Sequence, residues 1–355
     1  METYVRQLCE GLQGKRFSHQ VLTFHHNKKL PSIKQKVNGV TVTRIQPQVI
    51  WLSQPFSNNF RTTFLKNINQ FDLVHLHFPF PQAENLVKSI TQPLIITWCV
   101  DPAKTRWKIL AWLARPHYRT VVKKAYMIVA IGHGIIKNSS LLNNYLKKCC
   151  TIPLSFSKKQ IRSKAAYRTR FKKQFRVLFV GRLRKYKGLK YLVKAVALSS
   201  KNIVLNIVGD GEEKDSICSL ISKLNLSQRV KLLGSLSENQ KNIAFQNCDA
   251  FCLPSIHEAE GFGIVQAEAM SYGIPVINTW LKSGVPFVSR NGISGITVPP
   301  KNAHALAQAL ETLAFNKKKY NKFSAGALSR SKLFSENKML KKYNEVYQKA
   351  IKIIQ

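Results

Sequence analysis

Short apolar runs alternate with amphipathic stretches along almost the whole chain, and this alternation predicts its fold. Each run is rich in aliphatic residues and is bounded by Gly, Pro or polar residues, which is typical of a buried strand. Strands that alternate with helices form parallel sheets of the βαβ type, so we expect an α/β protein with two doubly wound domains. The predicted strands cover 19–24, 40–45, 72–77, 94–100 and 127–132 in the first half, and 176–181, 203–209, 230–234, 250–255 and 274–279 in the second.

A polar, basic segment at 156–174 separates the two sets of strands and is nearly free of large aliphatic residues, as expected for an inter-domain linker. We therefore predict an N-terminal Rossmann-like domain at 1–160 and a C-terminal one at 165–330. The segment 331–355 is predicted to be an amphipathic helix that packs back toward the N-terminal domain. Ligands of open α/β sheets bind beyond the carboxyl ends of the strands, so two such domains facing each other would form a cleft for two substrates.

The chain begins with a helical pattern rather than with a strand. Val5, Leu8, Cys9 and Leu12 recur at the spacing of one helix face. In a βαβ arrangement a strand should come before this helix. We therefore expect the first strand of the N-terminal domain to be absent from this chain.

The charge is strongly unbalanced, with 56 Lys and Arg against 17 Asp and Glu and a formal net charge of +39. Such a surface attracts polyanions, which include nucleic acid and anionic lipid. The excess is spread over both halves, and the sequence contains neither an aromatic–basic RNA motif nor a recognition helix. A nucleic-acid-binding module is therefore the weaker alternative, and no nucleic-acid partner is expected.

The cysteines indicate a cytoplasmic protein. All seven lack a CxxC or Cys/His ligand spacing, and most lie beside apolar residues, as buried reduced thiols do. No apolar run reaches the roughly 18 residues of a membrane-spanning helix, and no secretory signal is found.

The stretch "VLFVGRLRKYKG" places a basic loop directly after a predicted strand. Gly181 would let the backbone approach a ligand closely. Arg182 and Lys187 would then lie at the carboxyl end of the strand, ahead of a helix N-terminus, where they could clamp a pyrophosphate. A solvated surface loop is the alternative.

The stretch "LPSIHEAEGFGIVQAEAM" favours a ligand-binding loop. Glu260 precedes a predicted helix start near Gly263, and Glu268 lies roughly 7–8 Å farther along that helix. The helix N-terminus between the two carboxylates has free N–H groups and a positive dipole. This layout fits a nucleotide-sugar, with Glu260 at the sugar hydroxyls, the helix start at the diphosphate and Glu268 at the ribose. An ordinary surface helix with early acidic residues is the alternative.

These two stretches resemble glycosyltransferase family 4, whose members are retaining enzymes of the GT-B fold. "EGFGIVQAE" is similar to the E-x7-E element of the family and "GRLRKYKG" to its arginine/lysine element. "LKSGVPFV" is most similar to the bacterial mannosyl-, rhamnosyl- and glucosyltransferases of lipopolysaccharide and capsule assembly. The resemblance spans almost the whole chain and is most specific over 176–300.

The resemblance implies transfer of a hexose from a nucleotide-diphosphate sugar to a hydroxyl of a glycan acceptor, with retention of configuration, and we expect this acceptor to be lipid-linked. It implies catalytic roles for Glu260, Arg182 and Lys187. The implied donor-binding residues are Gly181, Arg182, Lys187, Leu232, Glu260, Phe262, Gly263, Ile264 and Glu268. Neither a metal ion nor a cofactor is implied, and the sequence lacks a DxD pair that could bind a metal.

The N-terminal half departs from the family pattern. Cys99 stands where the family has a histidine near the donor sugar, although Asp101 is kept. His133 lies beside the position of a usual serine, and His77, at the end of the predicted strand 72–77, is a candidate cleft residue. The family also begins with a strand and a Gly-Gly loop before the first helix, and both are expected to be missing here. A catalytically impaired relative that is kept for nucleotide or partner binding is therefore the alternative function.

The segment 105–126 combines Trp107, Trp112 and aliphatic residues with several arginines and lysines. A basic, Trp-bearing amphipathic segment suits an anionic membrane face. A packed helix of an α/β domain is the equal alternative. The sequence thus predicts a cytoplasmic enzyme that lies peripherally at the inner face of the membrane.

Overall fold

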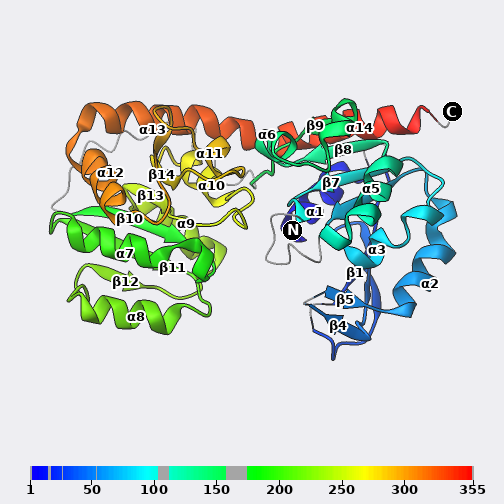
Figure 1. Cartoon of the computed structure of the whole chain (residues 1–355), viewed down its shortest axis with the longest axis horizontal. Helices are drawn as coiled ribbons and strands as arrows, with labels where there is room; N and C mark the ends of the chain where they lie inside the picture. The colour runs from blue at the N-terminus through cyan, green and yellow to red at the C-terminus, as the bar shows by residue number, and fades with distance from the viewer. Residues whose placement is uncertain are drawn as a thin grey trace. The chain divides into compact units, whose positions relative to one another are not determined.

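In the computed structural model the chain forms two compact units (Figure 1). The structure describes residues 2–14, 17–25, 27–52, 54–102, 112–156 and 174–353. Unit 1 comprises Met1–Leu154 together with Glu336–Gln355, and unit 2 comprises Ser155–Ser335. The predicted linker at 156–174 lies almost entirely outside the described residues.

Unit 2 is built on a six-stranded parallel sheet with the order β12-β11-β10-β13-β14-β15. Its strands are β10 (Phe175–Val180), β11 (Ile203–Val208), β12 (Val230–Leu232), β13 (Ala250–Leu253), β14 (Val276–Thr279) and β15 (Gly295–Val298). Its helices are α7 (Leu189–Leu198), α8 (Lys214–Lys223), α9 (Glu238–Asn247), α10 (Val265–Ser271), α11 (Val285–Val288), α12 (Ala303–Phe315) and α13 (Lys317–Ser331). All five predicted strands of this half are therefore confirmed within a residue or two.

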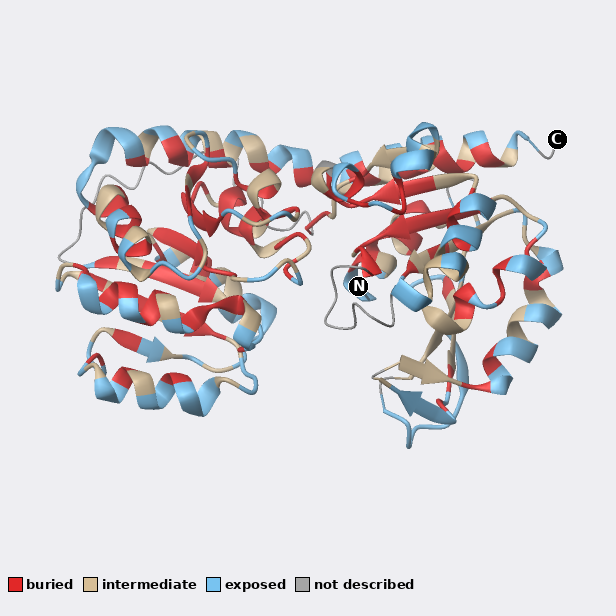
Figure 2. Ribbon diagram, in the orientation of Figure 1, coloured by how far each residue is buried: buried red, intermediate tan, exposed pale blue. Residues whose placement is uncertain are grey.

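The central strands of this sheet are buried on both faces. Every residue of β13 and β14 is buried, as Figure 2 shows in red. Parallel sheets covered by helices on both faces need such continuous apolar runs, and this is why the sequence pattern located these strands well.

Unit 1 contains two larger sheets and a hairpin. One sheet is parallel, with the order β6-β7-β8-β9, and the other has the order β1-β3-β2, in which β2 is antiparallel to β3. The strands are β1 (Gln20–Phe24), β2 (Ile33–Val37), β3 (Val40–Ile45), β4 (Val49–Trp51), β5 (Gln54–Phe56), β6 (Val74–Phe78), β7 (Leu94–Trp98), β8 (Met127–Ala130) and β9 (Cys149–Thr151). Among the described strands, β1 pairs only with β3 and β6 only with β7.

The apolar pattern located the longer apolar strands of unit 1 and missed the polar and the short ones. It predicted β1, β3, β6, β7 and β8. It missed β2 because its sequence, IKQKV, is polar and exposed, and it missed β4, β5 and β9 because they are only three residues long.

The first and last helices pack together in unit 1. The helices of this unit are α1 (Glu2–Leu12), α2 (Asn58–Asn67), α3 (Pro81–Glu84), α5 (Arg115–Lys124), α6 (His133–Lys137) and α14 (Glu336–Ile351). Leu8 and Leu12 of α1 share a buried cluster with Tyr343 and Tyr347 of α14. Helix α14 thus belongs to the same core as residues more than 300 positions earlier in the chain.

Buried polar groups tie α14 to the parallel sheet. His75 of β6 makes 2.7 Å hydrogen bonds with the hydroxyls of Tyr347 and Thr97. The Thr97 hydroxyl in turn lies 2.8 Å from that of Tyr343, and Tyr4 donates to Tyr343. Since buried polar groups are costly unless they are paired, this chain of hydrogen bonds fixes how the helix lies on the sheet.

None of the helices in the described ranges is long and apolar enough to cross a bilayer.

Candidate functional site

The candidate site lies at the carboxyl ends of β10 and β13, where the two predicted loops meet. The amide of Ile256, after β13, donates to the carbonyl of Tyr186, after β10, over 2.8 Å. Gly188 has a φ of +67°, and a Cβ there would overlap the carbonyl oxygen of Pro254. Glycine is therefore required at 188 both by the backbone conformation and by the close approach of the second loop.

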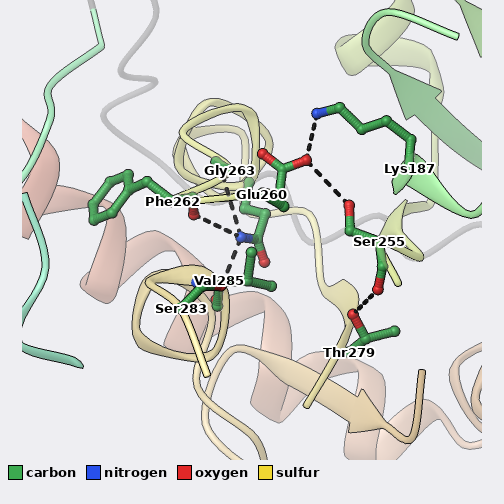
Figure 3. A network of polar contacts seen from close by, with 9 residues as sticks. Lys187, Ser255, Glu260, Phe262, Gly263, Thr279, Ser283 and Val285 are labelled. Atoms are coloured by element: carbon green, nitrogen blue, oxygen red, sulfur yellow. Dashed lines mark hydrogen bonds and ion pairs between the residues drawn. The ribbon is translucent and has the colours of Figure 1, made fainter. Parts of the chain in front are cut away.

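Lys187 and Glu260 form a buried ion pair at this junction (Figure 3). Lys187 is 9% exposed and Glu260 7%, and the Lys187 ammonium donates to Oε2 of the carboxylate. The Ser255 hydroxyl donates to the same oxygen over 3.1 Å, and the Thr279 hydroxyl donates to the Ser255 carbonyl. The sequence suggested separate roles for the lysine and the glutamate, and the structure brings them into direct contact.

The ammonium of Lys187 also lies beside Gly181. A Cβ built on Gly181 would be 3.6 Å from Lys187 Nζ. A bare glycine backbone therefore stands next to a buried cation at the end of β10, and the side chain of Arg182 follows in an exposed position. A ligand at this edge of the sheet can contact the Gly181 backbone, the Lys187 ammonium and the Arg182 guanidinium.

Buried side-chain amides hold the loop before α10 in place. Gln266 donates to the carbonyls of Phe262 (3.4 Å), Gly263 (3.3 Å) and Val285 (3.4 Å), as Figure 3 shows in part. Asn278 of β14 donates to the Gln266 side chain over 2.8 Å. Among the described residues, the amides of Gly263 and Ile264 have no hydrogen-bond acceptor, so they remain available to a ligand.

Glu268 is held by a lysine that the sequence analysis did not single out. Helix α10 begins at Val265, two residues later than expected, so Glu268 lies in its first turn. The ammonium of Lys241, on α9, is 3.1 Å from Glu268 and 3.0 Å from Glu238. Burial lowers the pKa of Lys241, but the two carboxylates outweigh it and raise that pKa. Lys241 is 27 positions from Glu268 in the sequence, and no local pattern links them.

The predicted base-binding stretch lies at the end of β12. Leu232 is its last residue and is half-buried. The amide of Gly209, after β11, donates to the carbonyl of Gly234 over 2.7 Å, which holds the ends of β11 and β12 together. The candidate donor-binding residues of unit 2 thus lie at the same edge of its sheet, after β10, β12 and β13.

Of the candidate residues of unit 1 that the structure describes, Cys99 and Asp101 are buried and His77 is half-buried. His77 stacks on His75 with 4.4 Å between ring centroids, and burial lowers the pKa of His77 to about 4. Burial raises the pKa of Cys99 to about 12, so this thiol stays neutral. Asp101 is buried as well. The side chain of His133 lies outside the described residues.

Comparisons with known proteins give matches over both units. The Glycosyltransferase Family 4 model matches residues 1–153, and the Glycosyl transferases group 1 model matches residues 161–330. The O-antigen chain mannosyltransferase C of Escherichia coli is 27% identical over 98% of this chain and 93% of that protein. An N-acetylgalactosaminyltransferase of Campylobacter jejuni, named for a diphospho-undecaprenol acceptor, is 31% identical over 61% of this chain and 58% of that protein.

Solved structures share the fold. Anabaena HepE in complex with UDP superposes with a TM-score of 0.69 at 19% identity and covers 87% of this chain and 86% of its own. At this identity the likeness concerns the fold, which is GT-B with two Rossmann-like domains. The fold class predicted from the sequence is thereby confirmed.

Proposed function

The chain belongs to glycosyltransferase family 4, and on this premise we propose that it transfers a hexose, with retention, from a nucleotide-diphosphate sugar to a hydroxyl of a lipid-linked glycan. The observation that carries the proposal is the buried pair of Lys187 and Glu260 at the carboxyl edge of the unit 2 sheet. Lysine and glutamate side chains are rarely buried, because the loss of hydration is costly unless the two charges pair and form further hydrogen bonds. A buried pair at the edge of a sheet therefore indicates a functional site.

The cationic groups would act on the leaving group. As the bond between the anomeric carbon and the diphosphate oxygen breaks, negative charge grows on the diphosphate. Lys187 and the exposed Arg182 would stabilise this charge, together with the free amides of Gly263 and Ile264. The acceptor hydroxyl attacks the same face of the sugar and passes its proton to the departing phosphate oxygen. With two cationic side chains in these roles, we propose that the reaction needs neither a metal ion nor a cofactor.

Glu260 would have a double role. Its Oε2 accepts from Lys187 and Ser255, which orients the carboxylate. Oε1 is then free to accept from donor-sugar hydroxyls, since a carboxylate has about four acceptor positions. The same contact keeps the ammonium of Lys187 in place before the donor arrives, so that little reorganisation is needed during the reaction.

Arg182→Ala is expected to weaken binding of a nucleoside diphosphate by about 1–3 kcal/mol, the usual size of a charge-assisted hydrogen bond. Binding of the free nucleoside should not change, because Arg182 is assigned to the phosphates alone. Calorimetric titration of both ligands measures this, with Lys190→Met as a control, since Lys190 is an exposed cation on the same segment. Equal weakening of nucleoside and diphosphate would remove Arg182 from the phosphate role.

We further propose that Glu268 binds the ribose hydroxyls and that Lys241 positions it. Lys241→Met should then lower affinity for a ribonucleoside diphosphate about three- to tenfold, which corresponds to the net value of about one hydrogen bond. A 2′-deoxy ligand should lose less, because it lacks one hydroxyl. Lys201→Met, at an exposed position of the same unit, should change neither affinity. A loss that is identical for both sugars would assign Lys241 a merely structural role.

The acceptor and the location are proposed from the relatives and the surface. The relatives named above include an O-antigen mannosyltransferase and a transferase with a diphospho-undecaprenol acceptor. We place the enzyme in the cytoplasm, peripherally at the inner face of the membrane. Trp112 and Leu113, from the basic segment 105–126, are exposed, which supports a membrane contact, whereas 103–111 lie outside the described residues.

One observation favours a second candidate function, nucleotide binding without efficient transfer. Cys99 is a buried neutral thiol at a position where the family resemblance places a histidine near the donor sugar. A neutral thiol is a weak donor and cannot replace a cationic imidazole. In this alternative the unit 2 site still binds the donor.

A donor panel tests the two functions against each other. Thermal shifts with UDP-, GDP- and dTDP-sugars would identify the donor, and transfer of its labelled sugar to polyprenyl-diphosphate glycans would then be followed. Transfer supports the enzyme, a shift without transfer supports the binding protein, and the absence of any shift contradicts both.

A further inference from the structure

The β4–β5 hairpin of unit 1 exposes an unusual apolar strand. Val49, Ile50 and Trp51 are 59%, 48% and 60% exposed, and β4 is pale blue in Figure 2. Successive side chains of a strand point to opposite faces, so a strand covered on one face would bury every second residue. All three are exposed, and therefore neither face of β4 is covered by the rest of the unit.

The exposed apolar surface continues next to the hairpin. Leu30 and Ile33 are also exposed. Residues 28–33 lie beside the start of the hairpin, because the Gln46 side chain donates to the Lys28 carbonyl (3.0 Å) and the Gln46 backbone amide donates to the Ser32 hydroxyl (2.9 Å). Contiguous apolar patches on a monomer mark interaction sites more often than isolated apolar residues do.

The segments that form this apolar surface contain basic residues and no acidic ones. No acidic residue lies between Glu10 and Asp72 in the sequence. The exposed lysines between residues 27 and 37 are Lys28, Lys29, Lys34 and Lys36. A partner for this face must therefore accept apolar side chains and carry negative charge.

We propose that the β4–β5 hairpin is a membrane-contacting element that inserts Ile50 and Trp51 into the interface of an anionic bilayer. Tryptophan favours the headgroup region, where an amphipathic ring is both buried and hydrated. Lysines next to the inserted side chains would bind anionic headgroups. This contact deepens the proposed function and rests on it, since a lipid-linked acceptor is reached only at a membrane.

A second copy of the chain fits this face less well. A two-fold symmetric contact would bring the lysines of both copies into one interface. No acidic residue of the 11–71 stretch could compensate them. A bilayer supplies the missing negative charge without this conflict.

Sedimentation of the full chain with vesicles tests the proposal. The vesicles contain phosphatidylglycerol mixed with phosphatidylcholine, or phosphatidylcholine alone. Wild-type protein should prefer the anionic vesicles, and binding should fall as salt rises because charges are screened beyond about 8–10 Å. Ile50→Ser combined with Trp51→Ser should weaken anionic binding about tenfold, which removal of two partly inserted apolar side chains would produce.

Matched variants separate the contributions. Lys34→Gln with Lys36→Gln should weaken anionic binding and reduce its salt dependence. Phe315→Ser, at an equally exposed position of unit 2, should bind as wild type does. Equal melting temperatures would show that the exposed substitutions leave the fold intact. Quenching by brominated lipids should be smaller in Trp51→Phe than in wild type.

The outcomes distinguish this proposal from the function. If the hairpin variant binds anionic vesicles as tightly as wild type, the hairpin proposal is wrong and the membrane contact lies elsewhere. If wild type binds no vesicles, the hairpin proposal fails, whereas the transferase function is still judged by sugar transfer in detergent. A concentration-dependent dimer that the serine variant abolishes, without lipid binding, would replace the bilayer by a second copy.

Discussion

Lys187→Met is expected to lower sugar transfer at least about a hundredfold, because it removes a cation from the leaving group and leaves Glu260 buried without its partner. Breaking one side of a buried ion pair costs about 3–5 kcal/mol, so unit 2 should also lose stability. Turnover and unfolding of unit 2 would be measured together. Lys190→Met, which removes an exposed lysine three positions away, should change neither.

The double variant Lys187→Met/Glu260→Gln separates the two effects. It removes both charges, so the uncompensated carboxylate is gone and much of the lost stability should return. Binding of the diphosphate and transfer should not return. If activity recovered together with stability, the pair would be a structural element and not part of the donor site.

Acidification from pH 7 to pH 5 is expected to destabilise unit 1 through His77. Burial lowers the pKa of this imidazole to about 4, whereas an unfolded histidine titrates near 6.5. The unfolded state therefore binds a proton more readily between these two values, and stability falls as the pH falls through this window. Between pH 6.5 and pH 5, His77 lowers the free energy of unfolding by about 2 kcal/mol.

Two other buried groups of unit 1 also change how its stability depends on pH. Burial lowers the pKa of His75, which adds to the effect, and it raises the pKa of Glu84 to about 7, which opposes it. His77→Phe should therefore become less sensitive to acid, and Glu84→Gln more sensitive. Tryptophan fluorescence during urea unfolding follows mainly unit 1, since Trp280 is the sole tryptophan of the sequence that unit 2 contains. An identical acid sensitivity of wild type and His77→Phe would contradict the assignment.

Much of unit 2 could be predicted from the sequence because its physics is local. Continuous apolar runs are needed for strands covered on both faces, and β10, β11 and β13 were found for this reason. Glycines and charged residues directly after such strands fall at one edge of the sheet. The sequence alone therefore predicts that Gly181, Lys187 and Glu260 lie in one region.

The contacts within the site could not be predicted in the same way. The Lys187–Glu260 pair joins positions 73 residues apart, and Lys241 reaches Glu268 from another helix. Only the packing of the loops after β10 and β13, and of α9 against the start of α10, decides which charges meet. Unit 1 was less predictable because β2 is polar and exposed and because β4 and β5 are too short to show a periodic pattern.

The assignment of the donor site to the buried Lys187–Glu260 pair can be checked by a crystal structure of the chain with the nucleoside diphosphate that gives the largest thermal shift. We expect the diphosphate at the carboxyl edge of the unit 2 sheet, with Lys187, Arg182 and the amides of Gly263 and Ile264 within hydrogen-bonding distance, and the ribose at Glu268. A nucleotide bound elsewhere, or with its phosphates away from Lys187, would contradict the claim.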